Sequence, residues 1–215
     1  MVKGIIFDLD GTILNTLRDL HEAVNHSLKK YGYKLKELED TKNNIGNGIR
    51  NLIIRSADNK LDYIDLLYTE FNQYYKIHYN DYTKEYDGIT DLLIYLKNKG
   101  LKLVCCTNKI NYAANGLIDA HFPNLFDLVV SDGMGINKKP DTAMIDYILN
   151  KLDLNKDEII YIGDSDVDIK TINNSNIEGI IVSYGFRDKS ILSNLYNNII
   201  DSPKELKEYL VERLK

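Results

Sequence analysis

The 215-residue chain contains few of the residues that interrupt regular structure, with 3 prolines and 13 glycines. Hydrophobic residues make up 44% of it and charged residues 27%, a balance that excludes a disordered chain and a collagen-like repeat. The sequence also has no internal repeat and no low-complexity tract. A chain of this length can bury a substantial core, either as one domain or as one domain with a modest insertion.

Cysteine is scarce as well, because the only two, Cys105 and Cys106, are adjacent inside one apolar run. They cannot build a disulfide framework, and this placement is typical of buried thiols in a reducing compartment. The apolar segment that begins at Met1 is interrupted by Lys3 and ends at Asp8, so it is too short for a signal-peptide core. We therefore expect a cytoplasmic protein.

Long apolar runs and an excess of positive charge are missing too. No run approaches the roughly 18 apolar residues of a membrane helix, which predicts no membrane partner. The formal net charge is −5, which argues against a basic surface for nucleic acid. The expected partner is a small molecule.

Five short runs rich in Ile, Val and Leu recur along the chain, and most of them precede a helical pattern. The runs are largely continuous rather than alternating, as in strands that are covered on both faces. They predict an α/β fold with a Rossmann-like parallel sheet flanked by helices. The expected strands are Gly4 to Phe7, Leu101 to Cys106, Phe126 to Ser131, Ile159 to Ile162 and Ile177 to Val182.

The stretch from Asn15 to Gly100 contains no convincing strand but several segments of helical period. It is too long for one crossover helix, which predicts an inserted α-helical cap domain over residues 15–86. Residues 1–14 and 87–215 then form the core domain. Thr16 is expected to cap the first helix of the insertion, with Asp19 supporting its first turn.

The first candidate site follows the first strand, where Asp8 and Asp10 precede Gly11. Residues two apart in an extended segment point to one face, so the two carboxylates project together at the edge where open α/β sheets bind ligands. Gly11 lets the chain turn close by. The alternative is a water-exposed Asp pair that caps a turn.

Two further groups follow later strands. Thr107 and Asn108 offer hydrogen-bond donors after the second strand, and Lys139 precedes Pro140 after the third. Taken singly, Thr107 also suits a helix cap and Lys139 a solvated surface. The four strand ends nevertheless deliver their polar residues to one edge of one sheet.

The fourth group is Gly163 to Asp168, directly after the strand at Ile159 to Ile162. Asp164 stands at the strand end and Asp168 lies about one helical turn beyond, so the two can face one another. Clustered carboxylates need a cation nearby, and an all-oxygen site with open positions suits Mg²⁺. Helix capping by Asp164 or Asp166 explains one of these residues but not the set.

The order and spacing of these four groups resemble the motifs of the haloacid dehalogenase superfamily of phosphohydrolases, over essentially the whole chain. The resemblance implies that Asp8 is the nucleophile, forming an aspartyl-phosphate, and that Asp10 is the general acid and base. It also implies that Lys139 neutralises charge, and that phosphoryl oxygens are held by Thr107, Asn108 and the backbone N–H groups at Gly11 and Thr12. The implied Mg²⁺ ligands are Asp8, the backbone carbonyl of Asp10, and Asp164. Asp168 would either ligate the metal or orient it without direct contact.

A finer resemblance is to the phosphoglycolate phosphatases, carried by Thr16 to Leu20, Ile45 to Arg50 and Ser183 to Phe186. It implies a small phosphorylated carboxylic acid such as 2-phosphoglycolate as substrate. Backbone N–H groups at Gly46, Asn47 and Gly48 can approach an anion, and Arg50 supplies a charged fork for a carboxylate or second phosphate. A loop glycine pair with a surface Arg is the alternative interpretation.

The chain departs from the family pattern at Asn15, where Asp is usual, and at Thr142, where a second Pro is usual. Neither change removes a catalytic group, and Asp141 can cap the helix that Thr142 begins. Pyrophosphatase, nucleotidase, sugar-phosphate phosphatase and phosphomutase activities stay open within the superfamily. A phospho-receiver signalling domain gathers similar residues but lacks a large helical insertion after its first strand. Monomer and homodimer are both open.

Overall fold

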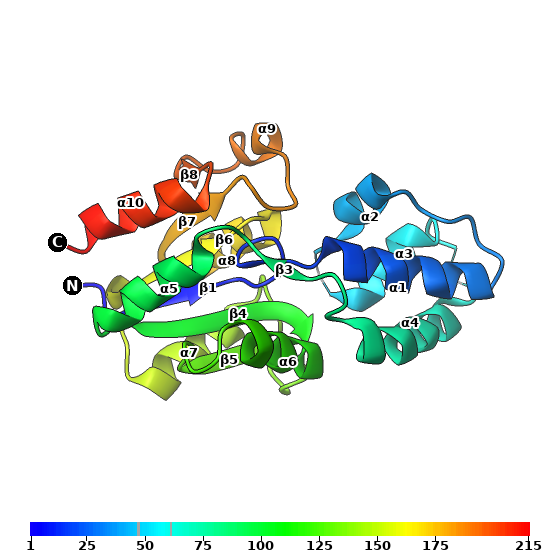
Figure 1. Ribbon diagram of the computed structural model, residues 1–215, viewed down its shortest axis with the longest axis horizontal. Coiled ribbons are helices and arrows are strands. Elements are labelled where there is room, and N and C mark those ends of the chain that lie inside the picture. Colours follow the sequence, from blue (N-terminus) through cyan, green and yellow to red (C-terminus); the bar gives the residue numbers. More distant parts are fainter. Residues whose placement is uncertain (47, 61) are drawn as a thin grey trace.

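The computed structural model describes residues 1–46, 48–60 and 62–215. Within them, one six-stranded sheet has the strand order β5-β4-β1-β6-β7-β8, and every neighbouring pair is parallel (Figure 1). This arrangement confirms the predicted parallel α/β sheet. The strands are β1 (Gly4–Phe7), β4 (Lys102–Ile110), β5 (Leu128–Asp132), β6 (Ile159–Gly163), β7 (Glu178–Val182) and β8 (Ile199–Ile200).

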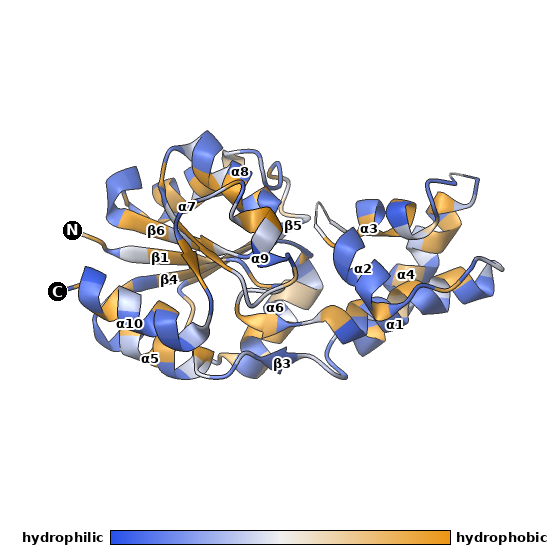
Figure 2. Cartoon of the chain, turned by 90° about the horizontal axis from the view of Figure 1, so that it is seen from above, coloured by the Kyte–Doolittle hydropathy of each residue, from blue (hydrophilic) through white to orange (hydrophobic). Residues whose placement is uncertain are grey.

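Helices cover both faces of this sheet, as Figure 2 shows with α7 and α8 on one side of the strands and α5 and α10 on the other. Alternation along β1 sends Ile5 and Phe7 into one buried cluster and Ile6 into the other. The first cluster includes residues of α5 (Ile89–Asn98), α6 (Asn111–His121) and α10 (Pro203–Arg213). The second includes residues of α7 (Ala143–Leu152), α8 (Asp166–Ser175) and α9 (Lys189–Leu192); a short 3₁₀ turn spans Lys156–Glu158.

Four further helices lie at one end of the molecule, opposite the two chain termini (Figure 1). They are α1 (Leu17–Lys30), α2 (Leu38–Asn44), α3 (Ile49–Ser56) and α4 (Ile64–His78). Their apolar faces share a third buried cluster, which includes Val24 and Phe71 and which Ala113 of α6 joins. The helical segment therefore has its own core and rests on the strand-edge end of the sheet through α6.

The expectation that residues 15–100 contain no strand was wrong. Strands β2 (Leu14–Asn15) and β3 (Lys84–Glu85) pair antiparallel where the chain enters and leaves the four helices. Each has two residues, which is too short to produce an apolar pattern. The carboxylate of Asp19 also ties these two crossings together, because it accepts hydrogen bonds from the N–H groups of Tyr82 and Thr83.

The predicted cap of the first helix was wrong as well. The Thr16 hydroxyl makes no capping bond and donates instead to Asp10 Oδ1 at 2.6 Å. The N–H of Leu17 donates to Asn15 Oδ1 at 3.3 Å, so the side chain of Asn15 rather than that of Thr16 bonds to the first turn of α1. At the other departure from the family pattern, Asp141 Oδ1 accepts from the N–H of Ala143, as expected for a cap of α7.

Strand β4 continues past the predicted end at Cys106 to Ile110, with a shift of register between these two residues. Thr107, Asn108 and Lys109 therefore lie on the irregular end of a strand rather than after it. Cys105 and Cys106 are both buried free thiols, as predicted. Among the described residues, none of the helices is both long enough and apolar enough to cross a membrane.

Candidate active site

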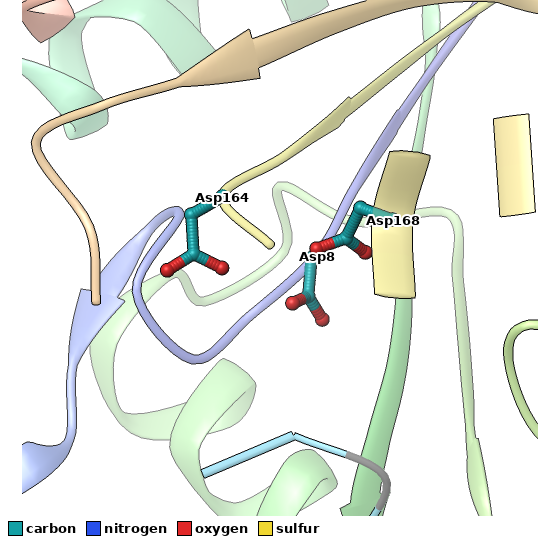
Figure 3. A group of neighbouring side chains, drawn as sticks. All are labelled: Asp8, Asp164 and Asp168. Carbon is teal, nitrogen blue, oxygen red and sulfur yellow. The ribbon is translucent and has the colours of Figure 1, made fainter. Parts of the chain in front are cut away.

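Three carboxylates meet at the carboxyl edge of the sheet (Figure 3). Asp8 follows β1, Asp164 follows β6, and Asp168 lies in the first turn of α8. One oxygen of each lies within 4.8 Å of the other two, and the residues are 8%, 2% and 0% exposed. Because adjacent parallel strands end at the same edge, residues that are distant in sequence form a single acidic cluster.

Lys139 is the buried cation of this cluster. Its Nζ lies 2.9 Å from Asp8 Oδ1 and 2.8 Å from Asp168 Oδ1, and it donates to the Tyr161 hydroxyl at 2.7 Å. The Tyr161 hydroxyl donates to Asp168 Oδ1, while Asp168 Oδ2 accepts from the hydroxyl and the N–H of Ser165. Asp168 is thus held by donors on both oxygens, and it fixes Lys139 beside Asp8.

Asp164 is held in a tight backbone niche. The N–H of Phe186 donates to its Oδ2 at 2.6 Å. A Cβ on Gly11 would lie 2.1 Å from the same oxygen, and Gly11 has φ +85°. The glycine is therefore needed both for the turn and for the approach of the carboxylate.

Burial and mutual repulsion act strongly on these acids. Burial raises the pKa of Asp8 to about 7; the charge of Lys139 opposes the shift, and Asp168 and Asp10 add to it. Burial, with the charges of Asp168 and Asp8, also raises the pKa of Asp164 well above its usual range. Burial opposes ionisation of Asp168 too, but Lys139 brings the pKa of that carboxyl below its usual range.

Asp10 has hydrogen-bond partners that differ from those of the other three acids. Its Oδ1 accepts from the Thr16 hydroxyl at 2.6 Å and from Lys109 Nζ at 2.7 Å. Lys109 is buried, and its Nζ lies 5.2 Å from the centre of the Tyr75 ring on α4. Sequence reasoning missed Lys109, although a lysine on a buried strand next to Thr107 and Asn108 was a signal that it needed a carboxylate partner.

The net charge of the site is matched to a divalent cation. When ionised, Asp8, Asp10, Asp164 and Asp168 face only two buried ammonium groups, those of Lys109 and Lys139, among the residues that the structure describes. The remaining charge is −2, since the third cation that lines the cavity, Arg187, is paired with a further acid, Asp166. The donors offered are all oxygens, which suits a hard cation.

Thr107 and Asn108 lie where the sequence placed them relative to this cluster. Thr107 Oγ1 accepts from the N–H of Lys109, which leaves its hydroxyl proton free to donate. Asn108 Nδ2 donates to the carbonyl of Lys139, and Asn108 Oδ1 is buried without a hydrogen-bond partner among the described residues. Both residues line a cavity of about 680 Å³, its open mouth included, that also holds Asp8, Asp10, Lys139 and Asp164.

Gly11 and Thr12 do not line this cavity. Their N–H groups donate to the carbonyls of Leu14 and Leu9, respectively, so they close the turn after Asp10. The structure therefore gives them a role in shaping the loop, and we do not retain them as anion ligands.

The four-helix segment supplies the opposite wall of the cavity. Gly46 and Gly48 of the predicted loop line it, together with apolar side chains of α1 and α3. Asn47 lies outside the described residues. The wall residues are Leu20, Ile45, Gly46, Gly48, Ile49, Leu52 and Tyr75.

The structure does not bring Arg50 to the site. It lies on α3, where Ile49 and Leu52 share the cavity face; one residue along a helix turns the side chain by about 100°. The Arg50 side chain is 54% exposed and pairs with Asp65 on α4 at 2.8 Å. The predicted loop therefore reaches the cavity through Gly46 and Gly48, whereas Arg50 lies on another face of α3.

A different arginine, Arg187, lines the cavity. Its side chain is 13% exposed, and it reaches from the loop after β7 to α2. Nη1 donates to the carbonyl of Lys42 at 3.1 Å, Nη2 donates to the carbonyl of Ile45, and Nε lies 3.4 Å from Asp166 Oδ1. The sequence pattern that we recognised ended one residue earlier, at Phe186.

Comparisons with known proteins agree over most of the chain. A family model described as haloacid dehalogenase-like hydrolase matches residues 5–182. The phosphoglycolate phosphatase of Nitrosospira multiformis is 32% identical over 195 residues, covering 87% of this chain and 86% of its own. That of Cereibacter sphaeroides is 28% identical over 216 residues, covering 97% and 98%. A crystal structure from Lactobacillus delbrueckii subsp. bulgaricus, provisionally named a phosphoglycolate phosphatase, superposes with a TM-score of 0.89 at 31% identity, covering 96% and 97%.

Proposed function

The chain belongs to the haloacid dehalogenase-like hydrolases, and from that premise we propose that it is a Mg²⁺-dependent phosphatase for a small phosphorylated carboxylic acid such as 2-phosphoglycolate. It is a phosphoric monoester hydrolase resembling the phosphoglycolate phosphatases. The observation that carries the proposal is the buried group of Asp8, Asp164 and Lys139, which lines one cavity, with Asp168 paired to Lys139.

The residues present fit a magnesium ion. Asp8 offers a carboxylate oxygen, and Asp164 offers Oδ1, because its Oδ2 is held by Phe186. The backbone carbonyl of Asp10 completes the proposed protein ligands. The bound ion supplies positive charge that neutralises the phosphoryl oxygens as an anionic nucleophile approaches.

Asp8 is the proposed nucleophile. One of its oxygens attacks phosphorus to form an aspartyl-phosphate, while the bond between phosphorus and the leaving oxygen breaks. Lys139, 2.9 Å from Asp8 Oδ1, stabilises the charge that passes to the phosphoryl oxygens. The free hydroxyl proton of Thr107 and the second Nδ2 hydrogen of Asn108 donate to those oxygens and orient them.

Asp10 is the proposed general acid and base. Lys109 and Thr16 hold its Oδ1, which leaves Oδ2 for proton transfer. It gives a proton to the leaving alcohol in the first step. In the second it takes one from the water that attacks phosphorus, breaks the bond to Asp8 and releases phosphate.

Residues 15–86 act in this proposal as a cap, with β2 and β3 as the two crossings. Support comes from the apolar side chains of α1 and α3 that face the catalytic aspartates across the cavity. A closed cap excludes bulk water and places the loop around Gly46 and Gly48 beside the substrate.

The test is a kinetic panel on the purified protein, with phosphate release measured in Mg²⁺ and after chelation. We expect the highest kcat/KM for 2-phosphoglycolate, above pyrophosphate, nucleotides and sugar phosphates, and no turnover without metal. Equal turnover of all esters would refute the substrate assignment. Activity that persists after chelation would refute the metal, and transfer to a second sugar phosphate in place of steady phosphate release would indicate a mutase.

A further inference from the structure

Three cations line the cavity among the described residues, and their nearest acid oxygens lie at 2.7–2.9 Å for the two lysines but at 3.4 Å for the third cation. Lys109 is paired with Asp10, and Lys139 is shared between Asp8 and Asp168. Together with a divalent ion they balance the carboxylates of the site, so neither has spare charge for the end of the substrate that does not react. The third cation is Arg187.

Arg187 is bonded differently from the two lysines. Its two terminal nitrogens donate to backbone carbonyls, which carry no net charge, and its one carboxylate contact, with Asp166, is long at 3.4 Å. A guanidinium has five N–H groups, of which three are directed at these partners. Among the residues that the structure describes, the other two N–H groups have no partner, and a buried, planar cation of this kind at the cavity wall binds a carboxylate well.

The position of Arg187 also fits the reacting centre. The preceding residue, Phe186, donates its N–H to Asp164, and both residues line the same cavity as Asp8. Gly46 of the cap loop lies against the guanidinium, since a Cβ there would be 3.2 Å from Nη2. A short substrate with its phosphoryl group at Asp8 therefore has Arg187 and the cap loop at its other end.

We infer that Arg187 binds the carboxylate of the substrate, which is the role that the sequence analysis predicted for Arg50. This inference rests on the proposed function, because it names the residue that binds the carboxylate of a phosphorylated acid. The same guanidinium donates to the carbonyls of Lys42 and Ile45 at the C-terminal end of α2. Arg187 thus connects the core domain to α2, and a substrate carboxylate bound to it would join the same contact. A neutral substrate cannot do so.

The experiment compares two esters that differ at the non-reacting end, 2-phosphoglycolate and 2-hydroxyethyl phosphate. For Arg187→Met we expect kcat/KM to fall about 10- to 100-fold on 2-phosphoglycolate, the effect of losing a charged hydrogen bond. On 2-hydroxyethyl phosphate the loss should be about threefold or less, since only the α2 contact is removed. Arg187→Lys keeps the charge without the fork and should fall between Arg187→Met and the native protein.

Arg50→Met is the matched control, a cap arginine outside the cavity, and should leave the ratio of the two kcat/KM values unchanged. Equal losses on both esters in Arg187→Met would overturn the inference and leave Arg187 as a contact to α2 alone. Calorimetric binding of both esters in Mg²⁺ separates this failure from failure of the proposed function. If the native protein turns over neither ester, a binding preference for the carboxylate that Arg187→Met removes still supports Arg187, and an unchanged or absent preference overturns it.

Discussion

Lys109 and Asp10 lie 99 positions apart in the sequence and form an ion pair, with Nζ 2.7 Å from Oδ1. The lysine comes from the irregular end of β4, and its Nζ also lies near the Tyr75 ring of α4. Thr16, at the entrance to α1, donates to the same oxygen. The proposed acid and base is therefore oriented by groups from both parts of the chain.

Lys109→Met removes this orientation but leaves Asp8 and Lys139 in place. We expect kcat/KM, which covers only the steps up to formation of the aspartyl-phosphate, to fall about 100-fold on alkyl phosphates, whose poor leaving groups need a proton from Asp10. The loss on p-nitrophenyl phosphate should be much smaller, because its leaving group departs without help. The kcat/KM values of the two esters, from initial rates at low substrate concentration, decide the matter, and equal losses on both would show that Lys109 supports the fold rather than Asp10.

Asp8→Asn keeps the shape of the side chain and removes the nucleophilic charge. Turnover should fall by orders of magnitude, with the fold intact by circular dichroism. Since the change also relieves charge repulsion within the buried cluster, we expect the Tm of the metal-free protein to rise by about 2–4 °C. Near-normal turnover would mean that another residue attacks phosphorus.

The sequence predicted the part of the site that follows from topology. Once the apolar runs are interpreted as adjacent parallel strands, Asp8 and Asp164 must meet, because both follow strands directly. It did not predict β2 and β3, since a strand of two residues has no apolar period. Nor did it predict Lys109 or Arg187, whose contacts join parts of the chain that only packing brings together. The predicted placement of Arg50 at the cavity was wrong, because the sequence did not establish which face of α3 points toward the cavity.

Metal binding should depend on pH through Asp8, whose pKa lies near 7 in the metal-free protein. Lys139, Asp168, Asp10 and Asp164 face this carboxyl. Because the folded pKa is raised above the unfolded value, the folded state holds an extra proton between about pH 4 and 7, and Asp8 lowers metal-free stability as pH rises through that window.

Mg²⁺ requires the ionised carboxylates of both Asp8 and Asp164, whose pKa values are raised, so its apparent affinity should rise at least about tenfold per pH unit below 7. The increase in Tm on adding Mg²⁺ should accordingly be larger at pH 8 than at pH 5.5. Thermal unfolding in chelator and in Mg²⁺ at both pH values checks this. Asp8→Asn is the control, and its Tm increase should lose the part of the pH dependence that Asp8 contributes; an equal increase at both pH values in the native protein would contradict the assignment.

A comparison of alanine variants at Gly11 and Gly32 distinguishes the effect of backbone strain from the effect of crowding Asp164. Both have positive φ, +85° and +70°, but a Cβ on Gly11 would lie 2.1 Å from Asp164 Oδ2, whereas a Cβ on Gly32 has nothing within 4 Å. Gly32→Ala should lower stability by about 1 kcal/mol with kcat/KM unchanged. Gly11→Ala should carry a similar strain and in addition displace Asp164, so the Mg²⁺ concentration for half-maximal activity should rise at least about tenfold. Titration of activity with Mg²⁺ for both variants, alongside chemical denaturation, checks this; a Gly11→Ala protein with the native Mg²⁺ requirement would show that Asp164 does not hold the metal.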